Sequence, residues 1–188
     1  MTVYDFDNPL VRGALGLALI DPTTQGPLSA QDKDALLRGE HTPPVPVDTV
    51  RLVGRRLGDI VWAEIYPLVS ARVIEAMVAA ELTGWATYPV VLRGADGQPQ
   101  AHFRGLAVLG RCRSIRFDRR RTVTVDNLDY WQGLRWDEST WDGSDFFMAS
   151  DRKTRFILIT AKARDLLHRH RFKWFEATPS TESRMVAY

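Results

Sequence analysis

The chain has one cysteine and no long apolar run, and these shortages exclude several kinds of protein. Cys112 stands alone among 188 residues, so neither an internal disulfide nor a cysteine-based zinc site can form. No apolar stretch approaches the roughly 18 residues that a membrane-spanning helix needs. The first residues, MTVYDFDNPL, are acidic and mixed and do not read as a signal peptide. We therefore expect a cytoplasmic protein with no membrane partner.

The chain also carries little net charge and no recognised catalytic motif. The formal net charge is only +2, which gives no general attraction for nucleic acid. No G-x-S-x-G, P-loop or dinucleotide-binding motif occurs, and the four histidines form no constellation. We expect no catalytic residue, no cofactor and no metal ion, and we do not expect nucleic acid to be a partner.

What is present is a pattern that recurs after ninety residues. Leu68 to Pro89 reads LVSARVIEAMVAAELTGWATYP, and Leu158 to Pro179 reads LITAKARDLLHRHRFKWFEATP. Aligned without a gap, the two stretches place chemically similar residues together: Ser70 with Thr160, Met77 with Leu167, Leu82 with Phe172, Trp85 with Phe175 and Pro89 with Pro179. Each copy predicts a helix that follows a hydroxyl residue and precedes a short aromatic strand.

Local signals support this interpretation of both copies. The side chains of Ser70 and Thr160 can each accept a hydrogen bond from a first-turn amide and so begin a helix. Val73, Ile74, Met77 and Val78 recur at helical spacing and define one buried face. Expected strands outnumber the helices, which appear singly between them. The sequence therefore predicts the α+β class, with a mixed, mostly antiparallel sheet and two helices from a duplicated strand–helix–strand unit.

The chain is expected to form a single domain over residues 1–188. Leu15, Leu17 and Leu19 alternate as in an edge strand. The stretch 21–50 holds five prolines and predicts a surface excursion with one short helix, Ala30 to Arg38. The core is expected over 60–180, around the repeat, and the last nine residues should fray.

Charged residues are segregated along the chain. Seven arginines fall within 104–121, and seven acidic residues follow within 126–151. Neighbouring strands of opposite charge can pair across a sheet, so internal pairing on a solvated face is one interpretation. A charged protein interface is another. A calcium loop is not indicated, because the EF-hand order of acidic ligands is absent.

One catalytic interpretation stays open. Cys112 lies between Arg111 and Arg113, which could lower the pKa of its thiol, and His102 could approach it across a hairpin. The acidic cluster from Asp137 to Asp145 could supply paired carboxylates. A small enzyme that uses Cys112 or this cluster is therefore the alternative function.

Aromatic residues are concentrated between Tyr130 and Phe147, where six occur in eighteen positions. Such residues fill cores, but tryptophan and tyrosine also anchor protein interfaces. The turn WDGSD is rich in Asp and Gly and is expected to project from the sheet. We predict that partner binding uses five residues of this stretch: Trp131, Trp136, Trp141, Asp142 and Asp145.

The stretch from WDGSDFF to RFILITAKARDLLHRHRFKWFEATP has a distinctive order. The Asp145-Phe146-Phe147 turn precedes an apolar strand, then a helix capped by Thr160, then a strand that closes at Pro179. In this order the chain resembles a bacterial immunity-protein family of polymorphic toxin systems, first catalogued as a domain of unknown function. The first copy of the repeat and the segment GLAVLGRC are similar to the same family. The second copy departs from it at Lys173-Trp174, where Thr-Gly is usual.

The resemblance implies a function without catalysis. Its members bind a cognate toxin, so we expect an immunity or antitoxin-like protein that neutralises a bacterial toxin by protein–protein contact. The type of toxin does not carry over, because the toxins of the family are diverse. A structural module of mobile-element origin is a third hypothesis, and the adjacent reading frame would discriminate among the three.

Overall fold

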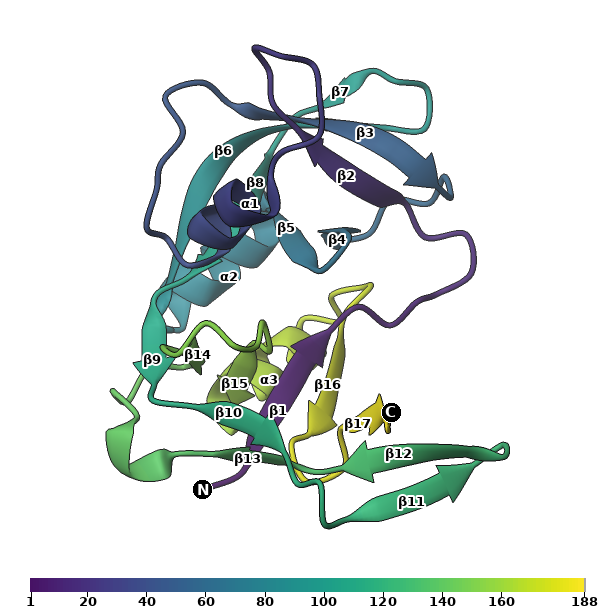
Figure 1. The fold of residues 1–188 in the computed structure, drawn as a ribbon. Helices are drawn as coiled ribbons and strands as arrows, with labels where there is room; N and C mark the ends of the chain where they lie inside the picture. Colours follow the sequence, from purple (N-terminus) through teal and green to yellow (C-terminus); the bar gives the residue numbers. More distant parts are fainter. Residues whose placement is uncertain (188) are drawn as a thin grey trace.

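The computed structural model describes residues 1–187, which form two halves (Figure 1). The upper half in Figure 1 is a barrel, and the lower half is a second sheet with a hairpin that projects from it. The predicted α+β class and the mostly antiparallel pairing are confirmed. No helix in residues 1–187 is both long and apolar enough to cross a membrane.

The first half is a barrel built from one curled sheet. Neighbouring strands follow the order β3-β2-β4-β5-β8-β6, and a parallel pairing of β3 with β6 closes the circle. Closure removes the free edges that would otherwise invite pairing with another chain. The short strand β7 (Pro99–Gln100) pairs outside the circle with β6. The barrel strands are β2 (Gly16–Ile20), β3 (Val47–Val53), β4 (Ile60–Ala63), β5 (Tyr66–Ser70), β6 (Trp85–Arg93) and β8 (Phe103–Val108).

The second half holds an open sheet in the order β16-β1-β15-β14-β9. Its strands are β1 (Val3–Asp7), β9 (Gly110–Cys112), β14 (Phe146–Ala149), β15 (Leu158–Thr160) and β16 (Glu176–Pro179). Two smaller sheets lie beside it. One pairs β10 (Ile115–Phe117) with β13 (Leu134–Trp136), and the other joins β11 (Thr122–Val125), β12 (Leu128–Gln132) and β17 (Arg184–Val186).

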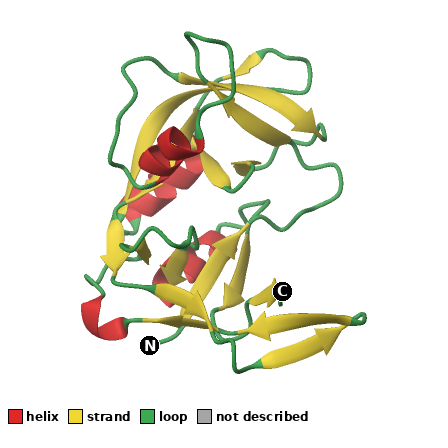
Figure 2. Cartoon of the chain, viewed as in Figure 1, coloured by secondary structure: helices red, strands yellow, loops and turns green. Residues whose placement is uncertain are grey.

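Three α-helices complete the described chain, with a short 3-10 helix at Glu138–Thr140 (Figure 2). α2 (Ala71–Ala79) and α3 (Ala161–Arg169) are the two helices of the repeat, and they contact each other. As predicted, the Ser70 hydroxyl accepts a hydrogen bond from the Val73 amide at 3.4 Å, and the Thr160 hydroxyl accepts one from the Ala163 amide at 3.3 Å. These bonds satisfy first-turn amides that have no partner within the helix.

The two halves share one arrangement of five strands. The first half runs β2-β4-β5-β8-β6, and the second runs β9-β14-β15-β1-β16. In both runs the first pair is parallel and the other three pairs are antiparallel. The fourth strand of each run comes from a different place in the chain: β1 lies at the N-terminus, before the barrel strands, whereas β8 follows α2 and β6. Each helix therefore connects two strands that flank an inserted third.

Several boundaries differ from the sequence prediction. The second copy's strand begins at Glu176 rather than Trp174, because Trp174 has a positive φ of 75° and lies in a turn. Arg184–Val186 is not a fraying tail, since it pairs with β12 as β17. The strand expected at the edge near Leu17 and Leu19 is β2, which pairs on both sides within the barrel.

The stretch 21–50 is only partly a surface excursion. Its helix α1 (Ala30–Leu37) forms where predicted, with Ser29 as its N-cap, but Leu36 and Leu37 are buried in the main core. Arg38 is buried too, and its guanidinium donates a 2.8 Å hydrogen bond to the Ala149 carbonyl of the second half. This part of the excursion therefore helps to join the two halves.

Candidate partner-binding surface

The turn that the sequence places at a partner interface is held by internal contacts. Trp141 is half-buried, with its ring 5.7 Å from that of Phe147, and its indole N–H donates to the Ser144 carbonyl at 3.1 Å. Asp142 is exposed, yet its carboxylate accepts hydrogen bonds from the Arg111 amide at 2.7 Å and the Ser144 amide at 3.0 Å. The turn folds back on the core of the second half and does not present a free anchor.

Asp145 is buried and cannot serve as the predicted contact residue. Only 8% of it is exposed. One carboxylate oxygen accepts hydrogen bonds from the backbone amide of Thr83 at 3.0 Å and from its hydroxyl at 3.3 Å. The other accepts one from the Thr160 hydroxyl at 2.7 Å. The predicted interface role is therefore wrong for this residue, which instead ties the start of α3 to the turn after α2.

Asp59, in the first half, makes the equivalent contact with the turn after α3 in the second half. Its carboxylate accepts a 3.1 Å hydrogen bond from the Lys173 amide, in the turn after α3, and pairs with Arg72 at 3.1 Å. Its carbonyl accepts from the Ser70 amide at 2.9 Å, just as the Asp145 carbonyl accepts from the Thr160 amide at 3.0 Å. We call these two residues the aspartate latches, because each half supplies one to the other.

The other two predicted tryptophans, Trp131 and Trp136, are half-buried against the hydrophobic core of the second half. Trp136 packs edge-on to Trp141, with ring centres 6.0 Å apart, and lies 5.2 Å from Phe147. Trp131 lies on β12, where the guanidinium of Arg119 covers its ring at 4.7 Å. Of the five predicted residues, the structure thus brings Trp136, Trp141 and Asp142 close together and leaves Trp131 with a cation over its face.

The alternative catalytic site does not take the form that the sequence allowed. Cys112 is 1% exposed, and burial raises the pKa of its thiol to about 11, so the thiol is protonated at neutral pH. Arg111 does not activate it, because its guanidinium donates to the carbonyls of Val108, Gly110 and Arg38. No hydrogen bond joins His102 to Cys112 in the described chain.

The acidic cluster also lacks the features of a catalytic pair. A hydrogen bond from the Ser139 hydroxyl, at 2.7 Å, lowers the pKa of Asp137, whereas a general acid needs a raised pKa. The carboxylate of Asp145 is already occupied by hydrogen bonds from Thr83 and Thr160. Within residues 1–187, no group of three or more His, Cys, Asp or Glu side chains is placed to hold a metal ion.

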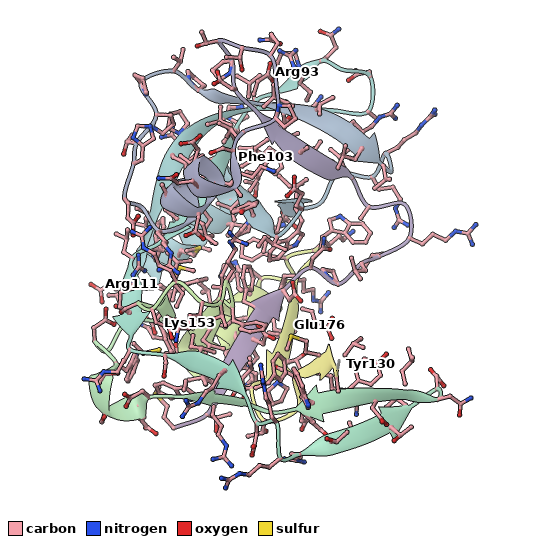
Figure 3. The ribbon with its side chains drawn as sticks, in the orientation of Figure 1. Arg93, Phe103, Arg111, Tyr130, Lys153 and Glu176 are labelled. Carbon is pink, nitrogen blue, oxygen red and sulfur yellow. The ribbon has the colours of Figure 1, made fainter. Side chains whose placement is uncertain are left out.

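The arginine run forms a surface that the sequence did not place. β10, the loop after it, β13 and the loop before β15 surround a groove of about 780 Å³. Lys153, on the last of these loops, is labelled in Figure 3. Six cationic side chains line this arginine groove: Arg116, Arg119, Arg120, Arg135, Lys153 and Arg155. Arg135, Lys153 and Arg155 come from outside the arginine run, so only the fold brings the set together.

A pair of carboxylates on β1 was also missed by the sequence prediction. Burial, and then repulsion from Asp7, raises the pKa of Asp5 to about 7. Burial likewise raises the pKa of Asp7, which lies opposite Glu176 across the β1–β16 pairing. The alternation in VYDFD hints at a shared face, but nothing local to β1 indicates that Glu176 joins it.

Comparison with known proteins does not identify a family for this chain. No family model matches the chain, and no curated protein matches it. The likeness to immunity proteins thus rests on the motifs of the sequence.

Proposed function

We propose that this chain is an immunity protein that binds a bacterial toxin and neutralises it by protein–protein contact. The proposal rests on the two segments that resemble the family, Leu68 to Pro89 and Leu158 to Pro179. Both form strand–helix–strand units, one in each half, with the Ser70 and Thr160 caps in place. The motifs of the resemblance are therefore structural ones, which fits a family defined by a scaffold rather than by catalytic residues.

We further propose that the two halves arose by duplication of one unit with exchange of a central strand. The registers support this. Ser70 pairs with Phe103 of β8 and Thr160 with Val3 of β1, while Pro89 pairs with Arg104 and Pro179 with Tyr4. The flanking residues are ninety apart, 70 with 160 and 89 with 179, and their partners on the inserted strands are one hundred apart, 103 with 3 and 104 with 4. The inserted strand therefore pairs in the same register in both halves. The aspartate latches support it as well, since the amides they bind, Thr83 and Lys173, are ninety residues apart.

A co-expression experiment tests the immunity function. The C-terminal domain of the protein encoded by the adjacent gene would be expressed in bacteria from an inducible promoter, with and without this chain. The proposal predicts growth arrest from the domain alone and restored growth when the chain is present. The matched control is the chain with Asp59 and Asp145 both changed to Ala, which should lose the fold and the rescue together. Growth arrest that the wild-type chain does not relieve, at equal expression, would rule the proposal out.

A further inference from the structure

The arginine groove carries more positive charge than its own surroundings neutralise. Arg135 pairs with Asp118, and Arg155 pairs with Asp34 at 3.0 Å. The other four cations of the groove have no carboxylate oxygen within 4.0 Å among the described residues. Of the acids that follow the arginine run, Asp142 and Asp145 bond elsewhere. Asp151 lines the groove, but its carboxylate accepts a hydrogen bond from the Lys153 backbone amide at 3.1 Å. Internal pairing therefore does not account for this surface.

Two of the cations are held against each other by the sheet. In the pairing of β10 with β13, Arg116 lies directly opposite Arg135. Like charges in opposite positions of an antiparallel pair destabilise it. Asp118 reduces this repulsion only in part, because its carboxylate pairs with the Arg135 guanidinium and not with that of Arg116. An anionic group in the groove would remove the remaining repulsion, so the strand pairing favours an anionic occupant.

The bottom of the groove is apolar. Ile115 and Phe117 are buried beneath it, and the Phe117 ring meets that of Phe156 edge-on, with centres 5.3 Å apart. Phe156 and Met185 are half-buried and line the wall. Charged rims around an apolar floor are typical of protein interfaces, where an apolar side chain enters the centre and charges pair around it.

We propose that the arginine groove binds an acidic segment of a protein partner that also carries an apolar side chain. The carboxylates would pair with Arg116, Arg120 and Lys153, and the apolar side chain would rest on Phe156 and Met185. The inference rests on the proposed function in one respect, since the toxin would present the segment. It goes beyond that function by naming the surface and the chemistry of what it binds.

The groove is less suited to nucleic acid. Base stacking needs an open aromatic face, but Arg119 covers the ring of Trp131 at 4.7 Å and Phe117 is buried. The carboxylates of Asp118 and Asp151 also line the groove. They would repel a continuous phosphate backbone, whereas a folded partner can place its few carboxylates away from them.

The test measures binding of labelled probes to the purified full chain by fluorescence anisotropy. The main probe is a short fluorescein-labelled peptide rich in glutamate with two leucines. A second peptide has glutamine for every glutamate, and a third probe is single-stranded oligothymidylate. The groove variant combines Arg116→Glu with Lys153→Glu, one from each wall. The matched control combines Arg104→Glu with Arg169→Glu, which are exposed, lie outside the groove and change the net charge equally.

The proposal expects the acidic peptide to bind, with affinity that falls as salt rises, and the glutamine peptide not to bind. The groove variant should weaken binding by about tenfold or more, and the control by about twofold or less. Equal losses in both variants would mean general charge attraction and would overturn the proposal. So would tighter binding of oligothymidylate with the same dependence on the groove. Because no toxin is used, failure here is separable from failure to rescue growth.

A single variant guards against a folding artefact. Arg116→Gln removes the repulsion from Arg135 and should leave the melting temperature unchanged or raise it, while it weakens binding of the acidic peptide. A lowered melting temperature together with unchanged binding would make Arg116 a structural residue and contradict the assignment.

Discussion

At the scale of single residues, the aspartates show how position in space overrides the local sequence. The turn WDGSD is rich in residues that build exposed turns, and it does form one. Asp145, however, is bound by Thr83, which lies 62 residues earlier in the chain. No local pattern indicates such a partner. The chemistry of the turn was therefore predictable, and the burial of its last carboxylate was not.

Removal of Asp145 should destabilise the protein without affecting any partner contact directly. Asp145→Ala leaves the Thr83 amide and the Thr160 hydroxyl without an acceptor, which should cost about 3 kcal/mol of the free energy of unfolding. Asp59→Ala should cost a smaller amount, since part of its ion pair with Arg72 is exposed to solvent. Denaturant unfolding of both variants checks this.

Asp142→Ala is the matched control for this pair. Its carboxylate is exposed and accepts hydrogen bonds from the backbone amides of Ser144 and Arg111, so about 1 kcal/mol is expected. If Asp142→Ala cost as much as Asp145→Ala, the latch would not be the special feature of this turn.

Asp5 should make the stability of the protein depend on pH in an unusual direction. Its folded pKa of about 7 lies above the ordinary value of 3.8, so the folded state holds the proton more tightly than the unfolded state. The stability that this proton supports is complete below the unfolded pKa and is lost as pH rises through about 7. Asp5→Asn removes the cost of ionising a buried carboxyl group. It should stabilise the protein at alkaline pH by on the order of 2 kcal/mol and change little at acid pH.

Thermal unfolding of the wild type and Asp5→Asn at both pH values measures this effect. Asp118→Asn is the control, because its pKa is lowered by Arg135 and its substitution should not stabilise the protein at alkaline pH. Equal melting temperatures of wild type and Asp5→Asn at every pH would show that Asp5 ionises normally.

At the scale of elements, the helices of the repeat were predictable and the strand order was not. Helix starts at Ser70 and Thr160 follow from a hydroxyl residue and a periodic apolar face, both of which are local. The strand that follows α3, β16, begins two residues later than predicted, since Trp174 occupies the left-handed conformation that Gly84 occupies after α2. The insertion of β1 between β15 and β16 depends on contacts across most of the chain.

The two helices should contribute equally to the core. Met77 and Leu167 are each 1% exposed, at matching positions of α2 and α3. Met77→Ala and Leu167→Ala should each lower the free energy of unfolding by about 2–5 kcal/mol, because each leaves a cavity in a packed interior. Val78, which the sequence pattern placed on the buried face of this helix, is 60% exposed, so Val78→Ala serves as the control and should have little effect. A small loss at either buried position would argue against equivalent settings for the helices.

At the scale of the whole molecule, the two halves are joined by several contacts and not by a linker alone. The first strand of the chain, β1, lies in the second half, and each half supplies an aspartate latch to the other. The helix α1 adds a further bridge through Arg38. Such a scaffold holds its surface residues in fixed positions. The arginine groove shows the consequence, since the fold brings Lys153 and Arg155, from the loop before β15, to the same groove as Arg116, Arg119 and Arg120. The run of arginines was visible in the sequence, and the groove was not.

Hydrogen exchange of the chain, alone and bound to the toxin domain from the adjacent gene, tests the central claim most directly. The claim is that the chain neutralises this partner by contact through the arginine groove. It predicts a stable complex in which exchange slows in 114–120 and 151–156, while α2 and α3 keep the protection they have without partner. No complex at micromolar concentrations would contradict the claim, as would protection confined to the barrel with the groove unchanged.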